Sequence, residues 1–209
     1  MGSPAADPPP ESLSKQIDFI LEIDRLKSVL RRTPLLDRSR RETDAEHSWQ
    51  IALMAILLAE YADPAVDIHH VVVMLLVHDL VEIDAGDTFI YDEQARATQA
   101  DRELRAAERI FGLLPAGQGE RLRALWEEFE AQESPDARFA NAMDRLQPLL
   151  TNYFTKGSTW KEPGVTQDRV IARNKLISLA SPQLWAYAEG LIQDATRQGF
   201  LRPANTDPQ

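Results

Sequence analysis

The sequence contains no cysteine, and this absence excludes several classes of site. Disulfide bonds, thiol catalysis, iron–sulfur clusters and zinc sites built on thiolates all need that residue. Acidic residues also outnumber basic ones. The sequence has 23 Lys and Arg and 33 Asp and Glu, which gives a net charge of −10. This charge argues against a partner that is a nucleic-acid polymer or an anionic membrane surface.

Long hydrophobic runs are absent as well. The apolar run Val71–Val77 is far shorter than the roughly 20 residues of a membrane-spanning helix. The first ten residues hold four prolines and no basic residue, which is unlike a signal peptide. We therefore expect a cytoplasmic protein with one domain over residues 12–201, flanked by polar flexible tails over 1–11 and 202–209.

Hydrophobic periodicity predicts helix through most of the chain. Apolar side chains recur with a helical period between residues 13 and 30, and further helices are expected over 44–61, 67–83, 92–112, 115–133, 135–154, 165–179 and 182–198. Alternating polar and apolar runs between turn signals do not occur, so no significant sheet is expected. The predicted fold is all-α, a helical bundle of about seven to eight helices.

Three of these helices have recognisable starts. Thr43 and Glu46 have the spacing of a capping box, in which the two side chains satisfy free backbone N–H groups. Asp67 can cap the helix that follows it, and Ser134-Pro135 places an N-cap before a proline at the first helical position.

The sequence has only four histidines, and their positions give them different expected roles. His47 falls in the first turn of one expected helix, and His78-Asp79 falls near the end of the most apolar one. A buried ionised carboxylate needs a cationic partner, which a divalent metal ion or an arginine can supply. The alternative is a core histidine that is hydrogen-bonded to Asp or backbone. His69 and His70 precede His78 by about two turns, so we expect them to be structural or exposed.

The order His47, then His78-Asp79, then Asp144 resembles the metal-binding signature of the HD-domain phosphohydrolases. The resemblance extends over roughly residues 13–155 and is closest to the 5′-deoxynucleotidase branch of that family. The further motifs that carry it are His78-Asp79-Leu80-Val81-Glu82, Gly86-Asp87, Ala45-Glu46-His47-Ser48, Arg25-Leu26-Lys27 and Arg32-Thr33-Pro34.

This resemblance implies an HD-type helical domain that holds one divalent ion. Its ligands would be His47, His78, Asp79 and Asp144. Two imidazoles and two carboxylates suit Mn²⁺, Co²⁺, Fe²⁺, Ni²⁺ or Zn²⁺ without selecting among them. Such an ion lowers the pKa of a coordinated water and polarises a phosphoryl oxygen.

The resemblance also assigns two acidic residues to catalysis. Glu82 would be the general acid or base, and Asp87 would help to orient the nucleophile. On a helix, Glu82 lies one turn beyond His78 and Asp79, on the same face. The alternatives are that Glu82 only pairs with an arginine and that Asp87 only caps the next segment.

Five arginines fall within eleven residues of this acidic chain, at positions 31, 32, 38, 40 and 41. Guanidinium groups match phosphate oxygens in a bidentate fashion, although a solvated linker is the ordinary explanation for most of the five. The resemblance implies that Arg32 binds the substrate phosphate, with Arg31 as the alternative. Family members that discriminate against ribose often carry Trp before the proline, where this chain has Thr33. The sugar preference is therefore left open.

The predicted activity is metal-dependent hydrolysis of a phosphomonoester, with (deoxy)nucleoside 5′-monophosphates as substrates. One alternative is another phosphoester, such as a nucleoside triphosphate, an alarmone or a cyclic nucleotide. Another is a metal-stabilised binding module without turnover, although a structural site needs no base such as Glu82. The expected partners are a small phosphorylated substrate and a second copy of the chain, since helical proteins of this size often form two-fold dimers.

Overall fold

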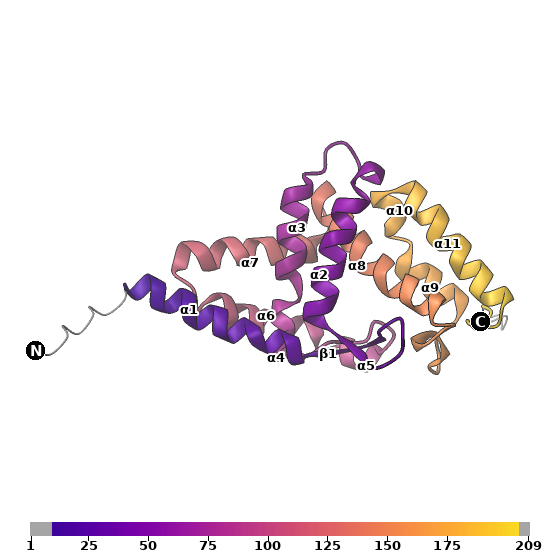
Figure 1. The fold of residues 1–209 in the computed structure, drawn as a ribbon, viewed down its shortest axis with the longest axis horizontal. Helices are drawn as coiled ribbons and strands as arrows, with labels where there is room; N and C mark the ends of the chain where they lie inside the picture. The colour runs from indigo at the N-terminus through magenta and orange to yellow at the C-terminus, as the bar shows by residue number, and fades with distance from the viewer. Residues whose placement is uncertain (1–9, 205–209) are drawn as a thin grey trace, which may run out of the picture.

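The computed structural model describes residues 10–204 and is built almost entirely of α-helices (Figure 1). Within that range, eight helices have eight or more residues: α1 (Glu11–Ile23), α2 (Asp44–Leu57), α3 (Ile68–Val77), α6 (Gln99–Phe111), α7 (Ala116–Ala131), α8 (Pro135–Phe154), α9 (Gln167–Asn174) and α11 (Pro182–Arg197). Shorter helices are α4 (Glu82–Ala85), α5 (Glu93–Arg96) and α10 (Ile177–Ala180). The predicted all-α class is confirmed.

The predicted helix starts are also confirmed. Thr43 Oγ1 accepts a hydrogen bond from the Glu46 backbone N–H, and the Glu46 side chain accepts one from the Thr43 N–H. Ser134 caps α8 with Pro135 in its first turn, and Asp67 caps α3. Each of these signals depends on residues only a few positions apart, which is why the sequence displays them.

The first predicted helix ends earlier than expected. α1 stops at Ile23, a 3₁₀ turn covers Asp24–Ser28, and strand β1 (Leu30–Pro34) follows. β1 pairs antiparallel with β2 (Arg41–Thr43), so the arginine-rich linker forms a two-stranded sheet. Strands this short and polar give no alternating pattern, and their pairing satisfies backbone groups that a linker would otherwise expose.

The third predicted helix is not continuous. α3 ends at Val77, a 3₁₀ turn covers His78–Val81, and α4 follows. Gly86 closes α4 with φ of 74°, a left-handed conformation that glycine adopts without strain. Gly86 therefore ends α4, and the segment that follows leads to α5.

Two later predicted helices are also divided. The range 92–112 contains α5 and α6, and 165–179 contains α9 and α10. Arg202, expected in a tail, pairs with Thr166 and donates hydrogen bonds to the carbonyls of Lys161 and Glu162. Glu11, also expected in a tail, begins α1, whereas tail positions 1–9 and 205–209 lie outside the described residues.

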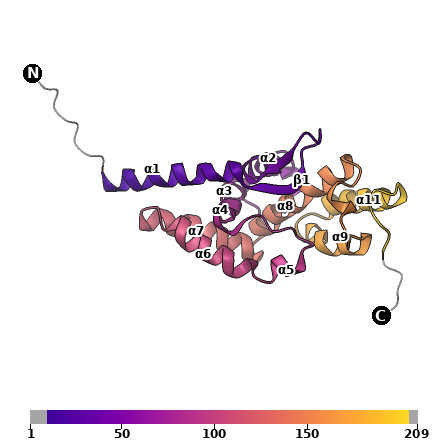
Figure 2. The ribbon, with the colours of Figure 1, turned by 90° about the horizontal axis from the view of Figure 1, so that it is seen from below.

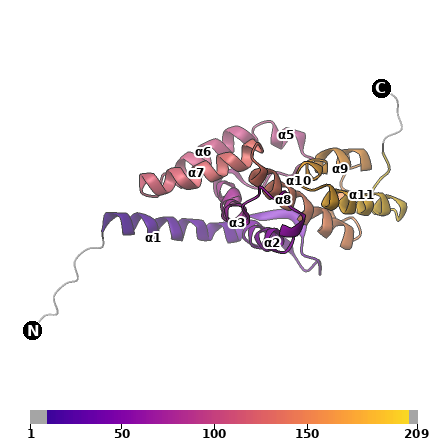
Figure 3. The same ribbon diagram turned by 90° about the horizontal axis from the view of Figure 1, so that it is seen from above.

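The helices bury two neighbouring apolar cores. α2, α3 and α8 form the centre of the first core, which α9, α10 and α11 complete at one end of the molecule. The second core lies between α1, α4, α6 and α7 at the other end, where α1 extends alongside α7 (Figures 2 and 3). Leu75 belongs to the first core and Val77 to the second, so His78 follows the point where the two meet. No helix in the described part is long and apolar enough to cross a membrane.

Candidate functional site

Three side chains that are distant in sequence converge where the two cores meet. His47 lies in the first turn of α2, His78 in the 3₁₀ turn after α3, and Asp144 in the middle of α8. Their ligand atoms all lie within 4.8 Å of one another, and His47 Nε2 is 2.9 Å from Asp144 Oδ1. Both histidines are buried. Two imidazoles and a carboxylate therefore face a common point.

Asp79 lies beside these three residues. Its Oδ1 is 3.0 Å from His78 Nε2, and its Oδ2 accepts a hydrogen bond from Arg31 Nη1 at 3.2 Å. The tighter three-residue group does not include Asp79. One oxygen of Asp79 thus faces His78, a candidate metal ligand, and the other accepts a hydrogen bond from Arg31.

The ring of His78 shows that a cation fits at this point. Its Nδ1 lies 2.8 Å from the Leu75 carbonyl oxygen, which can only accept, so Nδ1 carries a proton. Its buried Nε2 has no hydrogen-bond partner within the described structure and faces Asp79 Oδ1 and, at 3.9 Å, Asp144 Oδ1. Despite burial, these carboxylates raise the pKa of His78 to about 9. The surroundings thus attract positive charge to Nε2, and an N/O-ligated divalent ion meets that requirement.

Three further buried carboxylates lie near His47, His78 and Asp144, and their combined negative charge requires nearby cations. Glu42, Asp44 and Glu82 are buried, and each has one side-chain oxygen for which the described residues provide no hydrogen-bond partner. Burial raises the pKa of Glu42 to about 7. Burial and the neighbouring Asp79 also raise the pKa of Asp44 and of Glu82. A divalent cation would favour the ionised forms of all three.

Arg31 supplies part of the positive charge. Its Nη1 lies 3.3 Å from Asp44 Oδ1 and 3.9 Å from Asp87 Oδ1, in addition to its bond to Asp79. Burial alone would lower the pKa of Arg31, but the surrounding carboxylates raise it, so the guanidinium stays charged. Arg31 is therefore an internal counterion of the acidic cluster.

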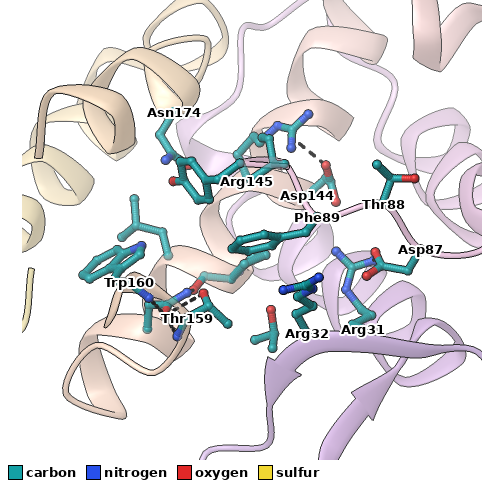
Figure 4. A pocket seen from close by; sticks show the side chains of 16 residues that line it. Arg31, Arg32, Asp87, Thr88, Phe89, Asp144, Arg145, Thr159, Trp160 and Asn174 are labelled. Atoms are coloured by element: carbon teal, nitrogen blue, oxygen red, sulfur yellow. Dashed lines mark hydrogen bonds and ion pairs between the residues drawn. The ribbon is translucent and has the colours of Figure 1, made fainter. Parts of the chain in front are cut away.

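A pocket with a cavity volume of about 90 Å³ opens at Asp144, one of the three converging residues (Figure 4). Asp144, Asp87, Arg31 and Arg32 belong to its lining, and Phe89, Tyr91, Trp160 and Asn174 form much of the remainder. The guanidinium of Arg32 lies 5.0 Å from the Phe89 ring centroid and donates to Glu162 Oε2 at 2.9 Å. The pocket thus joins a charged end to an aromatic end.

Arg145 adds another cation to the same lining. It follows Asp144 directly, and its Nε is 3.8 Å from Asp144 Oδ2. This Nε is buried without a hydrogen-bond partner among the described residues. The position of Arg145 suits binding to an anionic group of a ligand.

The segment after Gly86 closes one side of the pocket. Asp87 and Phe89 come from this segment, and Arg102 on α6 holds it in place. Arg102 donates to the Ala85 carbonyl, to Thr88 Oγ1 at 2.9 Å and to the Ala95 carbonyl at 3.3 Å. One side chain therefore ties both ends of the segment together.

The residues proposed for catalysis and phosphate binding fall at different depths. Asp87 and Arg32 line the pocket, whereas the described lining does not include Glu82, which is buried. Arg31, the alternative to Arg32, lies deeper in the acidic cluster. Trp160 lines the pocket.

Other aromatic residues and histidines of interest lie elsewhere. Trp49 is 61% exposed, and the Tyr153 hydroxyl donates to Asp194 Oδ2. His70 Nε2 lies 2.8 Å from Glu128 Oε2, and His69 is exposed. Neither histidine contributes to the converging group, in keeping with the structural role expected for them.

Sequence reasoning missed Glu42, Asp44, Arg145 and Gln147. Arg145 could have been found from its position next to Asp144. Glu42 lies in the short strand β2, Asp44 in the first turn of α2 and Gln147 within α8, and only their burial marks them.

The sequence profile of the HD domain matches residues 23–185. The chain belongs to the HD-domain family. Among proteins with an assigned name, this HD-domain chain is 30% identical over 139 residues to the 5′-deoxynucleotidase HDDC2 of Danio rerio, covering 64% of this chain and 68% of that protein. It is 30% identical over 136 residues to the human HDDC2, covering 63% and 65%.

Solved structures show the same architecture. A crystal structure from Magnetospirillum magnetotacticum, described as a predicted metal-dependent phosphohydrolase, is 57% identical. It covers 95% of this HD-domain chain and 100% of its own, with a TM-score of 0.90. A conserved hypothetical protein of Pyrococcus furiosus shares the fold at 18% identity, with a TM-score of 0.60 and coverage of 87% and 99%.

Proposed function

We propose that this HD-domain protein is a divalent-metal-dependent phosphomonoesterase that acts on nucleoside 5′-monophosphates, with 2′-deoxynucleotides as the preferred class. The observation that carries the proposal is the convergence of His47, His78 and Asp144, the last of which lines the charged end of a pocket whose other end is aromatic. The names of the HDDC2 relatives support the deoxynucleotide class.

The proposed ion is held by His47, His78, Asp79 and Asp144, where the buried Nε2 of His78 and the surrounding carboxylates favour a cation. When bound, Mn²⁺, Co²⁺, Fe²⁺, Ni²⁺ or Zn²⁺ would supply Lewis acidity at the phosphoryl oxygen and acidify a water molecule.

Glu82 is proposed to transfer the proton of the hydrolytic step. It lies one residue beyond the 3₁₀ turn that carries His78 and Asp79, and burial among carboxylates raises its pKa, so it can hold a proton at neutral pH. Asp87 lines the pocket 3.9 Å from Arg31, where it can orient the attacking water by accepting a hydrogen bond.

Arg32 is proposed to bind the substrate phosphate. Its guanidinium is about half exposed and has one carboxylate partner, Glu162, so it can turn toward an anion. Arg31 is held by Asp44 and Asp79 instead. The nucleoside would extend along Phe89 toward Trp160, since bases stack on aromatic rings.

A cytoplasmic homodimer is the proposed state of the protein. The surface that suits a second copy is the apolar side of α1, where Ile17, Ile20 and Leu21 are exposed. Sedimentation equilibrium of the wild type and of an Ile20→Glu/Leu21→Glu variant tests this proposal. A monomeric wild type would contradict it.

The activity itself is tested by phosphate release from a panel of deoxyribo- and ribonucleoside 5′-monophosphates, without metal and with Mn²⁺, Co²⁺, Mg²⁺ or Zn²⁺. We expect metal-dependent release, faster from the deoxy set. Equal release from both sets would remove the sugar preference and keep the chemistry. Pyrophosphate release from triphosphates would favour the other phosphoester class, and bound metal with no turnover of any phosphoester would favour a binding module.

A further inference from the structure

A buried hydrogen-bond network lies behind the His47 ring. Gln147 follows Asp144 by one turn of α8, and its Oε1 is 3.2 Å from His47 Nδ1. Its amide nitrogen donates to Glu42 Oε1 at 2.8 Å and to Gln50 Oε1 at 3.0 Å. His47 and Gln147 are 0% and 2% exposed, so water does not compete for these bonds.

The network determines which way the Gln147 amide is turned. With the proposed cation bound, Glu42 is ionised and only accepts hydrogen bonds, so the Gln147 atom that faces Glu42 is the NH₂ group. The Gln147 oxygen must then face His47. Two acceptors would repel each other at this distance, and the neutral ring therefore places its proton on Nδ1. On the other side of the ring, His47 Nε2 lies 2.9 Å from Asp144 Oδ1, a second acceptor, so the proposed cation takes the place of a proton there and binds the Nε2 lone pair.

We propose that Gln147 is a positioning residue that keeps the His47 proton on Nδ1 and directs the Nε2 lone pair to the cation. The proposal rests on the proposed metal site. Helix α8 then supplies both a ligand, Asp144, and the amide that orients the ligand of α2. Glu42 extends the network to the pocket, since its Oε2 lies 3.8 Å from Arg31 Nε.

Hydrogen-bond partners of this kind, behind a ligating histidine, are typically worth 10–100-fold in metal affinity. The test compares Gln147→Met with Gln50→Met, because each removes one amide from the network but only Gln147 contacts His47. We expect Gln147→Met to weaken binding of Zn²⁺ and Mn²⁺ by about 10–100-fold in competition titrations. Gln50→Met should bind as the wild type does.

A second readout uses the wild-type protein loaded with Zn²⁺, which is diamagnetic. Nitrogen-15 NMR should show the His47 proton on Nδ1, and this result does not depend on whether any variant folds. A proton on Nε2, or unchanged metal affinity in Gln147→Met, would overturn the inference. Neither measurement uses substrate. A wild type that binds metal but releases no phosphate would therefore contradict the proposed function and leave the role of Gln147 standing.

Discussion

Arg31 Nη1 lies 3.2 Å from Asp79 Oδ2, although 48 positions separate the two residues. The same nitrogen is 3.3 Å from Asp44 Oδ1. A single guanidinium therefore bridges carboxylates from α2 and from the 3₁₀ turn after α3. The strand that carries Arg31 is thereby fixed to the core of the protein.

Replacing Arg31 with methionine should destabilise the metal-free protein by about 3–5 kcal/mol, because buried carboxylates lose their partner. Urea unfolding measures the change. Arg32→Met is the matched control, since Arg32 is about half exposed and its ion pair with Glu162 contributes about 0–1 kcal/mol. Equal losses in the two variants would show that Arg31 is not the counterion of the cluster.

Asp79→Ala should lose metal and activity together, because the change removes a proposed ligand carboxylate. Metal content after dialysis, measured by atomic emission, and phosphate release are the two readouts. Stoichiometric metal in the variant would exclude Asp79 as a ligand and leave His47, His78 and Asp144 as the binding group.

Glu82→Gln should keep the metal and lower kcat by about 10²–10⁴-fold, since the amide preserves the shape of the side chain but cannot transfer the proton. Steady-state kinetics with metal analysis of the same samples test this expectation. Glu103→Gln serves as a control, because Glu103 is also a buried glutamate with a raised pKa but lies on α6. An unchanged kcat in Glu82→Gln would remove Glu82 from the mechanism.

Arg32→Ala should raise KM more than it lowers kcat, if the phosphate contact is as strong in the ground state as in the transition state. Glu162→Gln is the companion variant, since it releases Arg32 from its ion pair and should leave KM unchanged or lower. Initial rates over a range of substrate concentrations separate the two parameters. If KM and kcat both stay at wild-type values in Arg32→Ala, the phosphate contact belongs to another arginine, with Arg145 and Arg31 the candidates in the pocket.

The metal-free protein should lose stability as the pH rises from about 5 to about 7. Burial raises the pKa of Glu42 from 4.5 to about 7, so the folded state binds more protons than the unfolded state in this interval. The free energy of unfolding then falls with pH, and the raised pKa values of Asp44, Glu82 and His78 extend the fall to higher pH. Urea unfolding with EDTA should show this slope, and saturating Mn²⁺ should flatten it. A slope unaffected by metal would contradict the placement of the cation beside these groups.

Signals between residues close in sequence predicted much of the fold. Which of two neighbouring residues faces the site depended on contacts between residues distant in sequence. The Thr43 capping box and the Ser134 cap were visible because each involves residues three positions apart. The sequence did not reveal which of Arg31 and Arg32 points into the protein, because successive side chains of a strand point to opposite faces. Only the pairing of β1 with β2 fixes which one faces inward. Gln147 is polar in mid-helix, and only its burial against His47 distinguishes it.

The distances along the chain between the converging residues also set an order of assembly. Asp144 is 97 residues beyond His47, so during synthesis the nascent chain carries both histidines well before α8 has emerged from the ribosome. The cation site is complete only once α8 has packed against α2 and α3. With the proposed ligand set, metal loading would therefore be a late event in the maturation of the protein, and a chain truncated before α8 would expose its histidines without being able to retain the ion.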